Sequence, residues 1–343
     1  MDKCKSLNHD CTDGTVENAG DHPSLLHRRK VIIDTDPGID DMMAIFMAFQ
    51  SQDIEVIGLT TVFGNVDTPM CTINALHLCE VAGFPTVPVA EGSLVTLKGT
   101  LPRIADFVHG ADGLGNTFQA KPKGFKSESN ASDFLIQKVA EFPNEVTVVA
   151  LGPLTNIAEA IQKDPTFANN LAQLVVLGGS FFASGNVNPP AEANIYCDPE
   201  AADIVFTSGA NTVVIGLNLT TQVIFTAGDL QEIRDSKGRN AAYLYECCQF
   251  YKAWHIKSDH LDGIFLHDPT CMAALLDPSL FTYKTGALRV ETKGICVGHT
   301  LLDMGLKNWV GENPWIGQPP VKVGWTVDVE GVKALVKSLL CRP

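Results

Sequence analysis

Four carboxylates lie within eight residues near the start of the sequence: Asp34, Asp36, Asp40 and Asp41. They follow a short apolar run, residues 31–33, whose β-branched side chains are typical of a buried strand. Carboxylates crowded at one strand end repel one another, and a hard divalent cation such as Ca²⁺ or Mg²⁺ removes that repulsion because it takes oxygen ligands. The alternative is a helix N-cap with solvated turn aspartates. The number and spacing of the aspartates favour a metal or acid–base site.

The chain around these aspartates predicts strands that alternate with helices. Expected strands cover residues 31–33, 55–62, 86–90, 145–151, 173–177 and 212–217. Expected helices cover residues 42–49, 68–82, 131–141, 199–208, 227–256 with a break near 237, 267–276 and 332–340. Such alternation is typical of a mainly parallel sheet flanked by helices on both faces. The sequence therefore predicts a single large α/β domain over residues 28–343, after a flexible polar tail over residues 1–27.

Loops and helix starts complete this outline. Residues 94–124 and 184–196 are expected to be loops, residues 280–329 are β-rich with many turns, and Pro153 is expected in the first turn of a helix. Ligands of such sheets bind beyond the carboxyl ends of the strands. Several residues follow strands by a few positions and are therefore site candidates: Asp36, Asp40, Asp41, Asn65, Leu151, Asn186, Glu192 and Asn194.

Composition and charge exclude several classes of function. The formal net charge is −14 and no dense basic cluster occurs, which argues against nucleic acid as a partner. No apolar run is long enough for a membrane span, and no secretory signal is visible at the N-terminus. The ten cysteines are scattered and include no CxxC pair, which favours a reduced, cytoplasmic protein without a zinc site.

Five segments together resemble a known family. Residues 34–41, DTDPGIDD, look like the N-terminal signature of the nucleoside hydrolases, the Ca²⁺-dependent, inosine–uridine-preferring N-ribohydrolases. Four further segments fall in the family's order: Thr60–Asn65, Leu151–Asn156, Gly185–Asn194 and His267–Pro269. The match spans about residues 30 to 340, and its form resembles the plant members. It implies a Rossmann-like nucleoside hydrolase fold, a role in nucleoside salvage, and assembly as a homodimer or homotetramer.

The resemblance also implies a role for each matching residue. Asp36, Asp41, the Leu151 carbonyl and Asp268 would bind Ca²⁺, and Asp36 would act as general base on a Ca²⁺-bound water. Many members have Thr where this chain has Leu151. This difference should have little effect on cation binding, because the ligand is a main-chain carbonyl that any residue supplies. The ribose hydroxyls would be bound by Asp40, Asn65 and Asn194. The 5′-OH end of the substrate would be bound by Asn186 and Glu192, and the base side by His109 and His267.

Elementary chemistry is consistent with these roles. Cleavage of a C–N glycosidic bond generates an oxocarbenium-like sugar, as in O-glycoside hydrolysis. Carboxylates and amide oxygens, including that of Asn194, stabilise the developing positive charge. Ca²⁺ lowers the pKa of its water only modestly, so an adjacent carboxylate base is still needed. A histidine such as His267 can assist the departing base. Because pyrimidines need more of this help, uridine is expected among the substrates, with inosine, xanthosine and adenosine as candidates.

Two functional alternatives stay open at this point. The strand followed by Asp34-Thr-Asp36 resembles the start of Mg²⁺-dependent phosphohydrolases of the haloacid-dehalogenase type, although that family has Thr or Val where this chain has Gly38. A non-catalytic protein braced by Ca²⁺ is the other alternative.

Several site candidates also have purely structural interpretations. Asn65 after a glycine is a normal turn residue, and Asp268 before Pro269 is a standard helix N-cap. His109 lies in a glycine-rich loop where it could face solvent. Any base-stacking role of residues 251–260 is left undecided.

Overall fold

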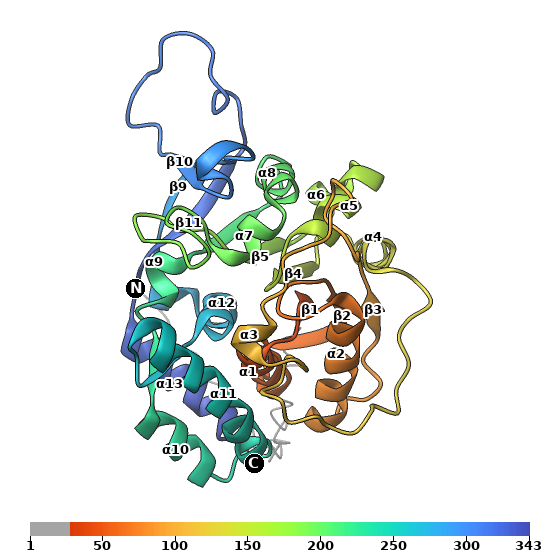
Figure 1. The fold of residues 1–343 in the computed structure, drawn as a ribbon. Coiled ribbons are helices and arrows are strands. Elements are labelled where there is room, and N and C mark those ends of the chain that lie inside the picture. Colours follow the sequence, from red (N-terminus) through yellow and green to blue (C-terminus); the bar gives the residue numbers. More distant parts are fainter. Residues whose placement is uncertain (1–27) are drawn as a thin grey trace, which may run out of the picture.

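A nine-stranded sheet forms the centre of the protein in the computed structural model, which describes residues 28–343 (Figure 1). Its strands are β1 (Arg29–Thr35), β2 (Ile54–Thr61), β3 (Val89–Glu91), β4 (Val146–Ala150), β5 (Gln173–Leu177), β6 (Thr212–Ile215), β9 (Phe281–Val290), β10 (Thr300–Asp303) and β11 (Pro320–Val327). Their order is β10-β9-β11-β6-β5-β4-β1-β2-β3. The sheet is parallel from β11 to β3, and β9 runs antiparallel to both of its neighbours.

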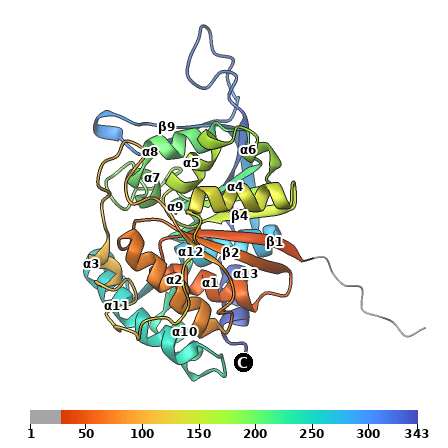
Figure 2. The same cartoon turned by 90° about the vertical axis from the view of Figure 1, so that its right-hand side faces the viewer.

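Helices cover both faces of the sheet (Figure 2). One face packs against α1 (Ile39–Gln50), α2 (Thr68–Ala82), α10 (Ala227–Asp235), α11 (Ala241–Asp259), α12 (His267–Leu276) and α13 (Val329–Leu340). The other packs against α4 (Ala131–Glu141), α5 (Thr155–Lys163), α6 (Phe167–Asn170) and α8 (Pro199–Phe206). Short elements complete the fold: α3 (Asp106–His109), α7 (Ala193–Cys197), α9 (Leu217–Thr220), the strand pair β7 (Ile224–Thr226) and β8 (Gly263–Phe265), and 3-10 turns at Pro278–Leu280 and Gly294–Cys296.

The apolar run of β1 shows why the sequence folds this way. Val31 and Ile33 pack into the core on one face of the sheet, and Ile32 packs into the core on the other. All three side chains are completely buried. A strand whose side chains alternate between two apolar layers has no polar face, which is why it reads as a continuous hydrophobic run. This central strand carries the four aspartates to the edge of the sheet where its neighbours also end.

The predicted fold class is confirmed: a single α/β domain with a large, mostly parallel sheet between helices. Three helices have the predicted bounds, namely residues 68–82, 131–141 and 267–276. The predicted tail, residues 1–27, lies outside the described residues. No helix of the described chain is long and apolar enough to cross a membrane.

Several local predictions were wrong. The third strand is β3 at residues 89–91, because residues 86–88 form a turn that leads into it. Pro153 precedes the helix rather than lying in its first turn, since α5 starts at Thr155 with Leu154 as N-cap. The loop predicted over residues 184–196 contains the start of α7, capped by Glu192. The short strands β7 and β8 were missed, because three residues carry too little periodicity to stand out.

Candidate active site

A pocket of about 480 Å³ lies at the carboxyl ends of the parallel strands. Polar side chains that the sequence analysis singled out line one part of it, called the polar end: Asp40, Asp41, Asn65, Asn194 and Asp268. Aromatic and imidazole rings line another part, called the aromatic end: Phe107, His109, Tyr251, Trp254, His255, Phe265 and His267. The two parts adjoin, since the Tyr251 hydroxyl donates to Asp40 Oδ2 at 3.3 Å and His109 Nδ1 lies 3.9 Å from Asp40 Oδ1.

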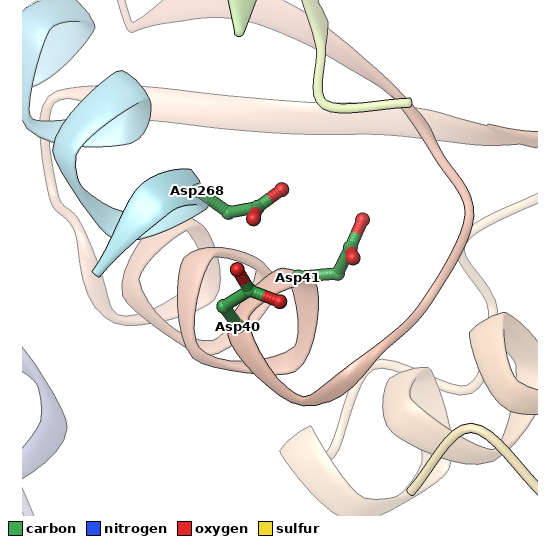
Figure 3. A group of neighbouring side chains, drawn as sticks. All are labelled: Asp40, Asp41 and Asp268. Atoms are coloured by element: carbon green, nitrogen blue, oxygen red, sulfur yellow. The ribbon is translucent and has the colours of Figure 1, made fainter. Parts of the chain in front are cut away.

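Three buried carboxylates converge at the polar end of the pocket (Figure 3). One oxygen from each of Asp40, Asp41 and Asp268 lies within 4.8 Å of the others. The first two belong to the opening turn of α1, and Asp268 belongs to the opening turn of α12. None of the three is an N-cap residue, because the N-caps are Gly38 and Leu266. Asp41 nevertheless helps to cap α1, since its Oδ2 accepts a hydrogen bond from the Gly38 N–H at 3.0 Å.

Asp36 lies beside this cluster but borders a second, much smaller cavity. That cavity measures about 30 Å³, enough for a water molecule, and shares Asn65 and Asn194 with the main pocket. The backbone N–H of Asn65 donates to Asp36 Oδ2 at 2.8 Å, whereas Asp36 Oδ1 is buried and has no hydrogen-bonding partner among the described residues. Burial and the neighbouring Asp41 raise the pKa of Asp36 well above its ordinary value.

The donor set fits a hard divalent cation. Burial and mutual repulsion raise the pKa of Asp268 well above its ordinary value and that of Asp41 to about 7. A buried oxygen of Asp268, Oδ1, also has no hydrogen-bonding partner within residues 28–343. Buried carboxylates that cannot all be ionised together, with oxygens left unpaired, are what a cation with oxygen ligands would stabilise.

Asp34 has a different role from the other three aspartates of the motif. Its Oδ1 accepts hydrogen bonds from Thr60 Oγ1 at 2.6 Å and from Asn156 Nδ2 at 2.8 Å. The side chain is fully buried and does not line the pocket. Asp34 therefore links β1 to β2 and to α5. Its partner on α5 is Asn156, for which the sequence analysis gave no role beyond its place in a motif.

Two asparagines predicted to bind ribose also hold the acidic cluster in place. Asn65 Nδ2 donates to Asp41 Oδ2 at 2.9 Å and to the Asp36 carbonyl at 3.1 Å. Asn194 Nδ2 donates to the Leu151 carbonyl at 2.6 Å. In both pairs, Asn65 with Asp41 and Asn194 with Leu151, a residue predicted to bind ribose contacts a residue predicted to bind the cation. A simple turn role for Asn65 does not account for these bonds.

The residues predicted at the 5′-OH end differ in their surroundings. Glu192 is the N-cap of α7, and its two oxygens accept hydrogen bonds from the backbone N–H groups of Gly179, Asn194 and Ile195 at 2.9–3.2 Å. Burial raises the pKa of Glu192 to about 7. Asn186 lines the pocket from an exposed loop. Glu192 therefore positions Asn194, a structural role that the sequence did not reveal.

Both predicted histidines border the aromatic end of the pocket. His109 is 5% exposed, so the interpretation that it faces solvent is wrong. Its Nδ1 accepts a hydrogen bond from the Ile39 N–H at 3.2 Å. His267 Nδ1 lies 2.7 Å from Thr220 Oγ1, and burial lowers the pKa of His267 to about 4. The His267 imidazole is therefore neutral near pH 7 and can take part in hydrogen bonds there.

The aromatic wall contains residues that sequence reasoning could not assign. Tyr251 stacks on His109 with ring centroids 5.0 Å apart, and its hydroxyl donates to Asp40 Oδ2 at 3.3 Å. Trp254 and His255 also line the pocket from α11, whereas His260 does not. The only signal in the sequence was their helical spacing, which is equally typical of a buried helix face. Cys247 and Cys248 on the same helix are buried, as expected for core positions.

Close packing around Asp36 yields a testable prediction. A Cβ on Gly152 would lie 2.6 Å from Asp36 Oδ1 and 2.9 Å from Val62 Cγ1, so Gly152→Ala must displace the Asp36 carboxylate. With Asp36 as the general base that the family resemblance implies, a displacement near 1 Å costs about 10²-fold in rate, so we expect kcat to fall about 100-fold while the fold is kept. Gly228→Ala is the matched control, because its Cβ meets nothing closer than 3.6 Å. Steady-state kinetics and circular dichroism check both; unchanged kcat in Gly152→Ala would contradict this account.

Comparison with known proteins assigns the chain to a family. A family model described as inosine-uridine preferring nucleoside hydrolase matches residues 31–334. A probable uridine nucleosidase 1 of Oryza sativa subsp. japonica is 61% identical over 318 residues, covering 93% of this chain and 98% of the relative. Uridine nucleosidase 1 of Arabidopsis thaliana is 59% identical over 314 residues, covering 92% of this chain and 94% of the relative.

A solved structure gives the same result. A plant nucleoside hydrolase superposes with a TM-score of 0.90 at 54% sequence identity, covering 92% of this chain and 99% of that one. The phosphohydrolase and non-catalytic alternatives are thereby set aside. The chain belongs to the inosine-uridine preferring nucleoside hydrolase family, and it is a hydrolase of N-glycosyl bonds.

Proposed function

We propose that this enzyme hydrolyses the N-glycosidic bond of ribonucleosides, with uridine as a main substrate and Ca²⁺ as its cofactor. The observation that carries the proposal is the buried acidic cluster with unpaired oxygens at one end of a pocket whose other end is aromatic. Inosine, xanthosine and adenosine are further candidate substrates. The plant relatives named as uridine nucleosidases support uridine in particular.

The cation would be held by Asp36, Asp41, the Leu151 carbonyl and Asp268, with Asp40 directly beside them. When bound, Ca²⁺ would supply a positive charge that lowers the pKa of a nearby water and attracts the ribose hydroxyls. Asp36 would accept the proton of the attacking water, for which its unpaired Oδ1 next to a water-sized cavity is suited. The side chains of Asp40, Asn65 and Asn194 would bind the ribose and stabilise its developing positive charge.

Departure of the base would take place at the aromatic end. The rings of Tyr251 and His109 provide a stacking surface of low polarity for a nucleobase. His267, held at Nδ1 by Thr220, would hydrogen-bond the leaving base. Asn186 and Glu192 would lie toward the 5′-OH. We also propose that the enzyme acts in cytoplasmic nucleoside salvage as a homodimer or homotetramer, with no nucleic-acid or membrane partner.

A reducing-sugar assay tests the proposed function. Ribose release from uridine and inosine is expected, with at least about 100-fold lower kcat/KM for 2′-deoxyuridine, because the cation and Asp40 would lose one hydroxyl of the diol. The free base is quantified by chromatography, and orthophosphate release from a phosphate ester serves as the negative control. Equal rates for uridine and 2′-deoxyuridine would rule out the diol contact, and absence of ribose from every nucleoside would overturn the proposed function.

A further inference from the structure

Asn74 of α2 joins two segments that both contribute residues to the pocket. Its Nδ2 donates hydrogen bonds to the Pro37 carbonyl at 3.1 Å and to the Asp112 carbonyl at 2.8 Å. Pro37 belongs to the turn that leads into the aspartates of α1, and Asp112 belongs to the glycine-rich loop after His109. Asn74 itself is only 4% exposed and does not line the pocket. One buried amide therefore holds both segments, although it lies outside the pocket lining.

The loop that Asn74 holds, residues 110–118, is closed on itself by hydrogen bonds. The Asp112 carboxylate accepts from the backbone N–H groups of three loop residues at 2.7–2.8 Å: Leu114, Asn116 and Phe118. The Gly115 N–H donates to the His109 carbonyl at 2.8 Å. A polar network whose members are satisfied in this way makes a segment rigid, so we expect the loop to move as one body together with His109.

His109 in turn contacts the start of α1. The Ile39 N–H donates to His109 Nδ1 at 3.2 Å, so the neutral imidazole carries its proton on Nε2. Ile39 follows Pro37 by two positions, and the loop starts directly after His109. A shift of the loop away from the turn would therefore break this hydrogen bond, which already lies at the long end of the normal range. The imidazole would then lose the partner that fixes its tautomer.

We propose that Asn74 is a positioning residue for His109: it docks the closed loop onto the acidic turn and thereby fixes the tautomer of an imidazole that borders the pocket. The inference rests on the proposed function only for the role of His109 on the base side of the substrate. Without the Asn74 amide, two carbonyls lose a buried donor, and the loop is free to shift against the turn. A misplacement of about 1 Å near the reacting groups costs about 10²-fold in rate, even when the substituted residue lies outside the site.

The first test observes the His109 tautomer without any substrate. Long-range proton–nitrogen NMR spectra of the full-length enzyme with isotope-labelled histidine separate protonated from unprotonated ring nitrogens, and His109 is assigned by its absence in His109→Ala. The native enzyme should show an unprotonated Nδ1. In Asn74→Ala, which removes the donor without adding bulk, the two tautomers should be mixed. Thr72→Ala is the matched control, because Thr72 is buried on the same helix and its hydroxyl bonds Thr61 and the Thr68 carbonyl. It should keep the native tautomer.

The second test is a double-mutant cycle, which asks whether Asn74 acts through His109. Asn74→Ala should lower kcat/KM for uridine at least about ten-fold in the native background. In the His109→Ala background the loss should be less than about two-fold, because no imidazole remains to be positioned. Thr72→Ala should change kcat/KM by the same factor in both backgrounds, and circular dichroism verifies that each variant is folded.

A substitution in the loop disturbs the same junction while the amide is kept. A Cβ on Gly113 would lie 2.8 Å from Asn74 Nδ2 and 3.1 Å from the Pro37 carbonyl oxygen, so Gly113→Ala should also mix the tautomers. Gly294→Ala is its control, since Gly294 has a φ of +75°, close to the +77° of Gly113, and nothing lies within 4 Å of the added Cβ.

The outcomes separate this inference from the proposed function. The native tautomer in a folded Asn74→Ala or Gly113→Ala enzyme, or an equal loss of kcat/KM in both His109 backgrounds, would overturn the inference alone. Absence of all nucleoside hydrolysis in the native enzyme would refute the proposed function, and the tautomer would then still decide whether Asn74 positions His109.

Discussion

Replacing Asp36 by Asn should lower kcat by about 10³- to 10⁴-fold and leave the thermal stability of the cation-free protein unchanged or slightly raised. The large kinetic effect is expected because an amide cannot accept the proton of the attacking water, and a general base is worth about 10²- to 10⁴-fold. The stability of the cation-free protein should not suffer, because Asn keeps the size of Asp and an oxygen for the Asn65 N–H, and its N–H₂ would lie at a water-sized cavity. The substitution also removes a buried carboxyl group, whose pKa is raised by burial and by the neighbouring Asp41.

The matched control for Asp36→Asn is Asp34→Asn, two positions earlier on the same strand. Asp34 Oδ1 accepts hydrogen bonds from Thr60 and Asn156 outside the pocket, and Asn can keep both. Its amide N–H₂ would replace Oδ2, which is buried without a partner among the described residues, and would leave a buried donor without an acceptor. We expect Tm to fall with kcat per folded molecule largely kept, the opposite of the Asp36 result. Calorimetry and single-turnover ribose release measure the two quantities. If Asp36→Asn retained more than a tenth of the native kcat, Asp36 would not be the base.

Removal of the cation should abolish activity and lower Tm by about 5 °C. A ligand at a concentration about 100 times its Kd stabilises the native state by about 2.7 kcal/mol, and a loss of that size moves Tm by several degrees in a domain this large. Dialysis against a chelator, followed by titration with Ca²⁺ or Mg²⁺, measures both effects. In Asp268→Asn, the chelator should change neither activity nor Tm further. Full activity after exhaustive chelation would exclude a metal role.

The stability of the cation-free enzyme should also depend on pH. Burial and Asp40 raise the pKa of Asp41 to about 7, from an ordinary value of 3.8. Between these values the unfolded chain has lost the proton and the folded chain still binds it. Folding therefore takes up a proton, and stability decreases as pH rises from about 4 to about 7. With the cation bound this decrease should be smaller, and denaturant titrations across this pH range compare the two forms.

Some parts of the fold and site could be predicted from sequence because each rests on a local pattern. The buried β-branched run of β1, the turn at Pro37 and Gly38, and the aspartates after it lie within twelve residues. Helix α12 was predicted with its bounds for the same reason, since its start and its apolar face are contiguous in the chain. The pocket contains every predicted site residue except Asp36, which borders the adjoining cavity.

Other parts depend on contacts between distant residues and left no local signal. Nothing in the sequence around Asp34 separates it from Asp36, yet the first bonds Asn156 across 122 positions and the second borders a cavity. The capping role of Glu192 depends on a short helix inside a segment rich in loop residues. The pairing of His255 with Asp259 spans a single helical turn, but only the tertiary position of α11 brings His255 to the wall of the pocket.

The distance along the chain between Asp41 and Asp268 has a consequence for synthesis. On the ribosome, the acidic motif at residues 34–41 emerges more than two hundred residues before α12, which supplies the third carboxylate. The strand β11, which pairs with both β6 and β9, comes later still. A nascent chain therefore carries uncompensated aspartates and an incomplete sheet until translation is almost finished. Proteins truncated before residue 268 should contain the signature motif, but they should fail to bind the cation and should be degraded by proteases.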